Sequence, residues 1–488
     1  MDSAAFEAYL GDDSRLGDPL PGAARGVAGG AACGDRIAIS LRLDGGRAVD
    51  SRCEASGCAA ARAAAAATAE LIDGATLHEA GLLDATRIAA ELGGLSAVGT
   101  HAADLASEAA HRALGAAVAG GADPLLGPPG AGGERVLVAV SGGVDSAVAA
   151  LLERRAGADV IAVTLELWSD PAGDGERSCC SAEAVRGARA VAHGMGIPHL
   201  TVDLRDAFRA GVVDPFLAGH AAGETPNPCV RCNGRVRIAP MVAIAGRLGA
   251  RGLATGHYAR LRDDGAGVLL TAAADRGKDQ AYMLAGLDPR TLARLRFPLG
   301  ELTKPEVREI AADAGLAVAE KAESQDLCFL AGVGKAGFLA RHGGLADRVG
   351  EIVDSAGTVL GAHRGHHRFT VGQRRGIGIA SPEPLYVLAT DAEANRVVVG
   401  GPRELATRRV RIRDATLHRP GSRVGSVKLR YRSRPLPCRI GTPSPDRLRP
   451  GRHGRLELEL AEPARAAAPG QAAILFDGDL IVGHGTIA

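Results

Sequence analysis

The sequence predicts an α/β protein built around a doubly wound parallel sheet. A smaller α+β domain precedes the sheet, and a small connecting domain and an antiparallel β-barrel follow it. Short apolar strands alternate with helical segments from residue 135 to about 330, which is typical of a parallel sheet covered by helices. From about residue 331 short strands are separated by turns, which is typical of antiparallel barrels. Residues 1 to about 120 are alanine-rich and mostly helical apart from one strand pair.

The chain of 488 residues is too long for one ordinary domain. Changes of pattern divide it into five segments: residues 1–121, a Pro/Gly-rich linker at 122–134, and residues 135–330, 331–400 and 401–488. It has no run of eighteen apolar residues, and its acidic start, MDSAAFEAYLGDDSR, lacks the build of a secretory signal. We therefore expect a soluble cytoplasmic protein without a membrane partner.

Cysteine content and charge narrow the class of function. Nine cysteines in a long cytoplasmic chain indicate metal, cluster or redox chemistry rather than a disulfide scaffold. Residues 331–488 carry 25 Lys/Arg against 14 Asp/Glu, a surplus of +11, whereas the first 330 residues carry −10. Such a basic half fits a polyanion partner. A solvated, arginine-rich surface explains the charge equally well, and charge alone does not separate the two.

The expected elements follow in chain order. The stretch DRIAISLRLDGGRAVDSRCE (35–54) alternates like a hairpin with its turn at Asp44-Gly45-Gly46. The predicted strands of the parallel sheet are VLVAV (136–140), VIAVTLEL (160–167), HLTVDL (199–204) and GLATGH (252–257), with a helix over SAEAVRGARAVAHGMG (181–196). The predicted strands of the last two domains are TVGQRRGIGIA (370–380), PLYVLATD (384–391), NRVVVGG (395–401), VRIRDATL (410–417), SVKLRYR (426–432), GRLELEL (454–460) and QAAILFDGDLIVGHG (471–485).

The stretch SGGVDS (141–146) lies where a nucleotide loop belongs in a doubly wound sheet, between the first strand and the helix after it. Gly142 and Gly143 allow backbone amides to approach a phosphate, and the start of the helix favours an anion. Ser141 and Ser146 add hydroxyl groups, and Asp145 can hold Mg²⁺ or cap the helix. No lysine follows, so this is not the phosphate loop of kinases and GTPases. A plain tight turn is the alternative.

SGGVDS resembles the pyrophosphate loop of the ATP pyrophosphatases, the adenine nucleotide alpha hydrolase-like proteins. Six further stretches resemble the tRNA-specific 2-thiouridylases: TPNPCVRCN (225–233), TGHYAR (255–260), GKDQAYML (277–284), FPLGELTKPEVREIA (297–311), SQDLCFL (324–330) and HHRFTVGQRRGIGI (366–379). The resemblance runs in order from about residue 135 to the C-terminus. It implies that ATP contacts Ala139, Val140, Ser141, Gly142, Gly143, Val144, Asp145, Ser146, Leu165 and Gly256. By pattern alone Leu165 is equally a core residue.

The resemblance also assigns roles to three cysteines. It implies that Cys232 is the nucleophile and that Cys328 carries a persulfide. Many family members have Asp where this chain has Cys229, so a third thiol is available here. Three thiolates can also hold a [4Fe–4S] cluster with one open iron that binds sulfide. Both the persulfide and the cluster interpretation stay open, and we lean to the persulfide for the roles.

The resemblance implies three RNA contacts around the thiols. Asn227, Pro228 and Cys229 meet the target base, which must leave the anticodon stack. Lys278, Asp279 and Gln280 form a second contact, and Arg430 and Tyr431 a third from the barrel. A solvated strand face is the alternative for KLRYRSR (428–434). The loop HHRFTVGQRRGIG (366–378) adds two histidines and three arginines suited to phosphates.

The first segment resembles the iron–sulfur scaffold proteins of the NifU/IscU type over about residues 24–120. Cys33, Asp35, Cys58 and His101 stand at the metal-site positions, but Ala102 occupies the place of the third cysteine. Two Cys, one Asp and one His still suffice for four-coordinate Zn²⁺, whereas an Fe–S cluster is less secure. Cys53 is a possible substitute ligand. A degenerate scaffold used for docking or delivery is the alternative.

Together these resemblances imply an ATP-dependent tRNA sulfurtransferase. ATP, with Mg²⁺, adenylates the C2 carbonyl of the wobble uridine, and sulfur then replaces the activated oxygen to give 2-thiouridine. The expected partners are tRNA and a cysteine desulfurase or sulfur-relay donor, and the first domain would deliver sulfur or a cluster. The alternatives are another adenylating ligase of this fold and an iron–sulfur assembly or carrier protein.

Overall fold

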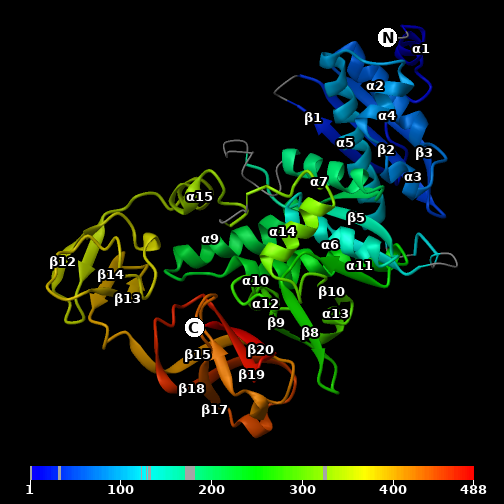
Figure 1. The fold of residues 1–488 in the computed structure, drawn as a ribbon. Coiled ribbons are helices and arrows are strands. Elements are labelled where there is room, and N and C mark those ends of the chain that lie inside the picture. The colour runs from blue at the N-terminus through cyan, green and yellow to red at the C-terminus, as the bar shows by residue number, and fades with distance from the viewer. Residues whose placement is uncertain are drawn as a thin grey trace.

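A computed structural model describes residues 3–30, 34–121, 124–127, 129, 133–170, 182–322 and 327–488. Figure 1 shows a helix-rich N-terminal domain, then a central α/β domain, and then two β-rich domains at the C-terminal side. The predicted fold class is confirmed, because a five-stranded parallel sheet is followed by a closed antiparallel barrel. None of the described helices has both the length and the apolar character that crossing a membrane requires.

The N-terminal domain has a three-stranded antiparallel sheet with helices packed against it. Its elements are α1 (Ser3–Gly11), β1 (Ala24–Gly29), β2 (Arg36–Asp44), β3 (Arg47–Ser56), α2 (Ala59–Ile72), α3 (Leu77–Gly81), α4 (Ala85–Glu91) and α5 (Ala97–Ala119). The predicted hairpin is formed by β2 and β3, with Asp44 paired to Arg47 across the turn. Strand β1 was not predicted from the sequence, since its residues, ARGVAG, include two glycines and show little apolar alternation.

The central domain contains the parallel sheet in the order β10-β7-β4-β5-β6. Its strands are β4 (Arg135–Ala139), β5 (Asp159–Glu166), β6 (His199–Asp203), β7 (Gly252–Thr255) and β10 (Leu295–Arg296). Helices α6 (Val144–Arg155) and α7 (Ala182–Gly194) pack on the face that carries the core residues Val136, Val138 and Val160. The other helical elements are α8 (Arg205–Phe208), η2 (Arg209–Val213), α9 (Asp214–Ala221), α10 (Pro228–Cys232), η3 (Asn233–Arg237), α11 (Ile238–Arg247), α12 (Ala281–Leu284), α13 (Pro289–Leu292) and α14 (Lys304–Asp313).

A hairpin of the central domain joins the sheet of the barrel. Strands β8 (Ala259–Asp263) and β9 (Val268–Ala272) follow β7 directly, and Thr271 of β9 pairs with Leu480 of the last strand. The barrel consists of β15 (Ala406–Leu417), β16 (Ser426–Lys428), β17 (Leu436–Thr442), β18 (Gly451–Arg465), β19 (Ala472–Asp477) and β20 (Leu480–Ile487). It closes through pairing of β15 with β20. The hairpin β8–β9 of the central domain therefore belongs to the same continuous sheet as the barrel strands.

The connecting domain has α15 (Gly334–Gly343) and a four-stranded sheet of β11 (Gly350–Val353), β12 (Val359–His363), β13 (Tyr386–Asp391) and β14 (Arg396–Gly400). The strand predicted at 370–380 is wrong, because this stretch forms turns and irregular backbone. Gly372, Gly376 and Gly378 there adopt φ values of +86°, +76° and +78°. These left-handed conformations are incompatible with a strand.

The largest hydrophobic core runs from the N-terminal domain into the central domain. It joins apolar residues of α2 and α5 to those of β5, β6 and α11. In Figure 1, α5 runs from the N-terminal domain down to the parallel sheet, and it packs against β6 as well as against β1 and β2. The two domains are therefore packed together through α5 rather than only joined by the linker.

Candidate functional site

The predicted nucleotide loop forms the connection between β4 and α6. Gly142 has φ +72°, and a Cβ there would lie 2.8 Å from the carbonyl oxygen of Ala184. Ser141 N donates to Ser146 Oγ at 3.0 Å, and Ser146 Oγ donates to the Gly143 carbonyl at 3.0 Å. These bonds fix a tight turn at the carboxyl end of the first strand. Glycine is required at Gly142 both for the backbone conformation and for the close approach to α7.

Asp145, in the first turn of α6, binds two partners from distant parts of the chain. Its Oδ1 accepts a hydrogen bond from the Tyr258 hydroxyl at 2.8 Å and one from Lys304 Nζ at 2.7 Å. The Lys304 side chain is 9 % exposed. Within the described part of the chain both partners use Oδ1, so Oδ2 can serve a cation. One carboxylate with phosphate oxygens and water is a donor set that Mg²⁺ accepts.

A second lysine reaches the loop from the segment that leads to Cys328. Lys321 Nζ donates to the Gly142 carbonyl at 3.0 Å. Lys304, Lys321 and Tyr258 were not predicted as site residues from the sequence. Lys304 and Tyr258 lie inside quoted motifs, but nothing in their spacing indicates contact with Asp145. The glycine loop is thus flanked by two ammonium groups, which suits a polyphosphate.

Two neighbouring strands complete this end of the sheet. Gly256, just after β7, lies so close to α6 that a Cβ would be 2.7 Å from Ser146 N. On the other side, Thr164 Oγ1 of β5 donates to the Val140 carbonyl at 2.8 Å, and Leu165 is buried. The structure therefore brings the predicted ATP-contacting residues together around the carboxyl ends of β4, β5 and β7.

Cys229 and Cys232 lie on α10, one turn apart. Asn227 caps this helix, since its Oδ1 accepts bonds from the backbone amides of Cys229 and Val230 at 3.2 Å each. Pro228 occupies the first helical position, where its missing N–H costs nothing. The helix continues into the π-helical turn η3, which is a common irregularity at functional sites. Burial raises the pKa of the Cys229 thiol, and nearby Arg237 opposes this rise.

Cys328 belongs to a segment anchored by its neighbour Phe329. The Phe329 ring packs edge-on against Phe208 at 5.8 Å and against Phe216 at 5.2 Å between centroids. These two phenylalanines flank η2, and η2 also packs against α10. The Cys328 segment and the helix with Cys229 and Cys232 thus share η2 as a common neighbour. Cys232 is buried, whereas Cys229 and Cys328 are partly exposed.

The predicted RNA contacts lie where the central domain meets the barrel. Tyr431 of the barrel donates to the Asp279 carbonyl at 3.2 Å, and its ring lies 5.8 Å from that of Tyr282. Lys428 Nζ lies 5.8 Å from the centroid of the Tyr282 ring, and Arg430 is exposed. The hydroxyl of Tyr282, a residue not predicted from the sequence, donates to the Ala472 carbonyl at 2.9 Å, and Asn227 lies beside it. Basic and aromatic groups therefore surround the PNPC segment.

The segment Lys278–Gln280 connects this region to the nucleotide loop. Gln280 Oε1 accepts from Tyr258 N at 3.0 Å, and Tyr258 in turn binds Asp145. Asp279 Oδ1 accepts from the backbone amides of Ala273 and Ala281. A chain of contacts therefore runs from Asp145 through Tyr258 and this segment to Tyr431.

In the loop at 366–378 the two histidines are buried, whereas Arg374 and Arg375 are exposed. The histidines belong to the connecting domain's interior, where His366 Nδ1 lies 3.3 Å from Asn395 Oδ1. Only the arginines are placed to meet phosphates.

The scaffold-like site is only partly described. Cys58, exposed and just before α2, donates from Sγ to Asp35 Oδ2 at 3.3 Å, and its backbone amide donates to Asp35 Oδ1 at 2.7 Å. His101 is an exposed residue in the first turns of α5. Cys33 lies outside the described residues, as do Cys179 and Cys180. Cys53 is a poor substitute ligand, because it is 1 % exposed and burial raises the pKa of its thiol to about 12.

The part of the chain that the structure describes contains no group of three or more Cys, His, Asp or Glu placed to hold a metal ion. This holds for the described residues of both cysteine sites.

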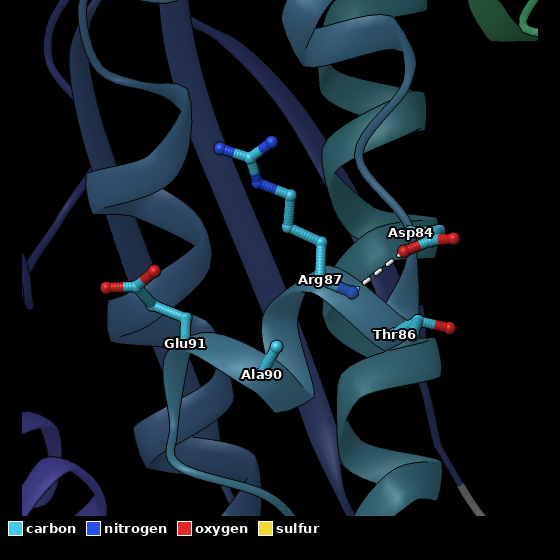
Figure 2. A pocket seen from close by; sticks show the side chains of 5 residues that line it. All are labelled: Asp84, Thr86, Arg87, Ala90 and Glu91. Atoms are coloured by element: carbon cyan, nitrogen blue, oxygen red, sulfur yellow. Dashed lines mark hydrogen bonds between the residues drawn. The ribbon is translucent and has the colours of Figure 1, made fainter.

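A surface pocket lies on the N-terminal domain around α4 (Figure 2). It is lined by Asp84, Thr86, Arg87, Ala90 and Glu91. The one hydrogen bond drawn there is a helix cap, from the Arg87 amide to Asp84 Oδ1 at 2.8 Å. The pocket contains none of the predicted site residues, and its lining comes from a single short helix and its cap.

Comparison with known proteins matches four parts of the chain to families. Residues 16–118 match the NifU-like N terminal domain, 134–332 the tRNA methyl transferase HUP domain, 336–401 the tRNA methyl transferase PRC-barrel domain, and 415–487 the Aminomethyltransferase beta-barrel domain.

Whole-chain relatives give a consistent result. The bifunctional protein NifU/MnmA of Rubrobacter xylanophilus is 44% identical over 472 residues, which cover 95% of this chain and 93% of the relative. The tRNA-specific 2-thiouridylases MnmA of Geobacter metallireducens and of a Synechococcus species are 43% and 45% identical over 363 residues each. These cover 72% of this chain and 96% and 97% of the relatives. The chain therefore belongs to the MnmA family of tRNA-specific 2-thiouridylases, in the bifunctional form that begins with a NifU-like domain.

Proposed function

We propose that this protein thiolates C2 of the wobble uridine of tRNA, using ATP to activate the carbonyl oxygen. The enzyme class, an ATP-dependent tRNA sulfurtransferase, follows from its family. The structural observation that carries the site assignment is the contact chain from Asp145 through Tyr258 and Lys278–Gln280 to Tyr431. It links the phosphate loop to the barrel, and α12, which follows this segment directly, packs against the thiol helix α10.

In the first step the uracil C2 oxygen attacks the α-phosphorus of ATP, and pyrophosphate leaves. The amides of the loop 141–146, with Lys304 and Lys321 beside them, stabilise the charge on the phosphates. Mg²⁺, held by Asp145, would neutralise part of that charge. The activated oxygen is then part of a good leaving group, AMP, which the uracil carbonyl oxygen alone is not.

In the second step the terminal sulfur of a Cys328 persulfide attacks C2, and AMP leaves with the former carbonyl oxygen. The Cys232 thiolate attacks the inner sulfur of Cys328, which breaks the persulfide S–S bond and leaves sulfur on the base. A Cys232–Cys328 disulfide results, and a thiol reductant must reopen it before the next turnover. A cysteine desulfurase or relay protein then reloads Cys328 with sulfur. Because the substrate is tRNA, the reaction takes place in the cytoplasm.

Cys229 has a supporting role in this proposal. Burial raises the pKa of its thiol. Cys229 is therefore mostly protonated at neutral pH, and a protonated thiol is a weaker nucleophile than a thiolate. It is the first cysteine of the CxxC pair and lies beside Tyr282 and Tyr431, whose titration it influences. We place it against the flipped base together with Asn227 and Pro228.

The test separates the two steps. With tRNA, ATP and a persulfide donor, wild type should release pyrophosphate and AMP and form 2-thiouridine. Cys232→Ser and Cys328→Ser should form no 2-thiouridine but still release pyrophosphate. Cys438→Ala is the matched control, because Cys438 is buried in the hydrophobic core of the barrel. Undiminished thiolation by both serine variants would overturn the roles of the two cysteines. Pyrophosphate release without 2-thiouridine formation in wild type would favour another adenylating ligase, and absence of tRNA-dependent pyrophosphate release in wild type would favour an assembly or carrier protein.

A further inference from the structure

Helix α5 of the NifU-like domain covers the open edge of the catalytic sheet. Strand β6 is the last strand in the order β10-β7-β4-β5-β6. Its Pro198 carbonyl accepts from Ala162 of β5, so the next carbonyls in alternation, those of His199 and Thr201, point away from the sheet. The Nδ1 atom of His111 lies 2.8 Å from the carbonyl oxygen of His199. A Cβ at Gly115 would lie 1.8 Å from the carbonyl oxygen of Thr201.

Next to this contact, Arg112 of α5 reaches the end of β5. Its Nε and Nη2 donate to the two carboxylate oxygens of Glu166 at 3.0 and 2.5 Å. Its Nη1 donates to the Val27 carbonyl of β1 at 2.5 Å, and Glu108 lies 2.7 Å from Nη2. The side chains of Arg112 and Glu166 are 18 % and 6 % exposed. One guanidinium therefore ties the scaffold-like sheet to the catalytic strand.

Glu166 is the last residue of the strand that supports the nucleotide loop. Val163, three residues earlier, accepts from Val140 N at 2.9 Å, and Thr164 donates to the Val140 carbonyl. Leu165, the predicted adenine contact, lies directly before Glu166. A shift of this strand end moves both the backbone partner of the loop and the adenine-side residue.

The pairing leaves Glu166 dependent on Arg112. A carboxylate that is almost fully buried needs a cation or several donors to stay charged in place. In the described part of the chain, Arg205 is a second arginine close enough to act on the charge of Glu166. It is held by Asp203, with Nε 2.9 Å from Oδ1. Without Arg112 the charged Glu166 would have to turn toward solvent, and the end of β5 would move with it.

We propose that Arg112 of the NifU-like domain is a positioning residue for the ATP half of the thiouridylase site. It acts through Glu166 and touches neither nucleotide nor RNA. The inference rests on the proposed function, in that ATP binds at the carboxyl ends of β4, β5 and β7. It assigns the NifU-like domain a role in the catalytic half that does not depend on any metal or sulfur it carries.

The test measures binding of a non-hydrolysable ATP analogue by the full chain, and steady-state kinetics with tRNA. Arg112→Gln should weaken ATP binding about tenfold, within the range of coupled sites, and raise KM for ATP. Both kcat at saturating ATP and KM for tRNA should stay near wild type. Arg112→Lys should recover part of the affinity, because it keeps the charge but not the bidentate geometry.

Two further variants keep the test decisive if Arg112→Gln folds poorly. Glu166→Gln in the Arg112→Gln background removes the uncompensated buried charge, so the double variant should bind ATP better than Arg112→Gln alone. Arg25→Gln is the matched control, since Arg25 pairs with Glu54 at 2.9 Å entirely within the NifU-like domain, and it should leave KM for ATP unchanged.

The outcomes are distinguishable from failure of the proposed function. If wild type does not bind the ATP analogue, the nucleotide site itself is wrong. If wild type binds it and both Arg112 variants bind equally well, the positioning role is overturned. A fall in thermal stability with an unchanged KM for ATP would also overturn it, because the contact would then be only structural.

Discussion

The ammonium group of Lys304 lies 2.7 Å from Oδ1 of Asp145, although the two residues are 159 positions apart in the chain. Lys304 begins α14, and Asp145 lies in the first turn of α6, so this ion pair joins two helices at the nucleotide loop. Its lysine side chain is 9 % exposed, whereas 35 % of the aspartate side chain is exposed. The aspartate therefore remains reachable by a ligand while the lysine is fixed.

We expect Lys304→Ala to reduce both stability and ATP affinity. A hydrogen bond to a charged group contributes about 1.5–3 kcal/mol, and the substitution also removes a positive charge beside the phosphates. Urea unfolding measures the first effect, and the Kd of an ATP analogue measures the second. Glu301→Gln is the control, because its ion pair with Arg260 is at the surface and should contribute less than about 1 kcal/mol. Equal behaviour of the two variants would contradict the role of Lys304.

The two glycines of the loop should respond differently to alanine. Gly142→Ala places a Cβ 2.8 Å from the Ala184 carbonyl at φ +72°, which costs at least about 1–2 kcal/mol in backbone strain. At Gly143 the nearest atom to a new Cβ is Ser141 Oγ at 3.8 Å, so Gly143→Ala should fold normally. It should nonetheless weaken ATP binding, because the methyl group occupies space next to the amides that face the phosphates. Thermal unfolding and ATP titration of both variants check this pattern, and a stable Gly142→Ala protein would refute it.

Local features of the site were predictable from the sequence, and its long-range contacts were not. The hairpin turn at Asp44-Gly45-Gly46 and the loop SGGVDS depend on residues that are adjacent in the chain, so their chemistry is visible in a short window. The pairing of Lys304 with Asp145, and of Arg112 with Glu166, depends on how helices pack on the sheet. No periodicity or spacing encodes such pairs. The wrong strand at 370–380 shows the reverse case, in which alternation suggested a strand but three glycines with positive φ broke it.

We expect Cys229 to react slowly with iodoacetamide at neutral pH and faster as the pH rises beyond the ordinary range of a thiol. Burial raises its pKa, and thiol alkylation requires the thiolate. Arg237→Gln should slow the reaction at a given pH, because Arg237 is the charge that lowers this pKa. Mass spectrometry of alkylated peptides gives the rate for each cysteine. The exposed Cys58 provides an internal control whose rate should not change in the variant, and a faster Cys229 in Arg237→Gln would contradict the electrostatic argument.

Lys428 should contribute to tRNA binding through its charge. It lies over the Tyr282 ring at the edge of the PNPC segment, and burial lowers its pKa while nearby Asp279 opposes this. If Lys428 neutralises one phosphate, Lys428→Gln should weaken tRNA binding and reduce the slope of log K against log salt by about 0.7–0.9. The ATP affinity should not change, since Lys428 belongs to the barrel side.

Arg434→Gln is the matched control, because Arg434 is 70 % exposed and paired with Glu462. A Lys428→Gln protein with an unchanged salt slope would place the RNA backbone elsewhere, and the same loss in both variants would indicate a diffuse effect of barrel charge rather than a contact at the site.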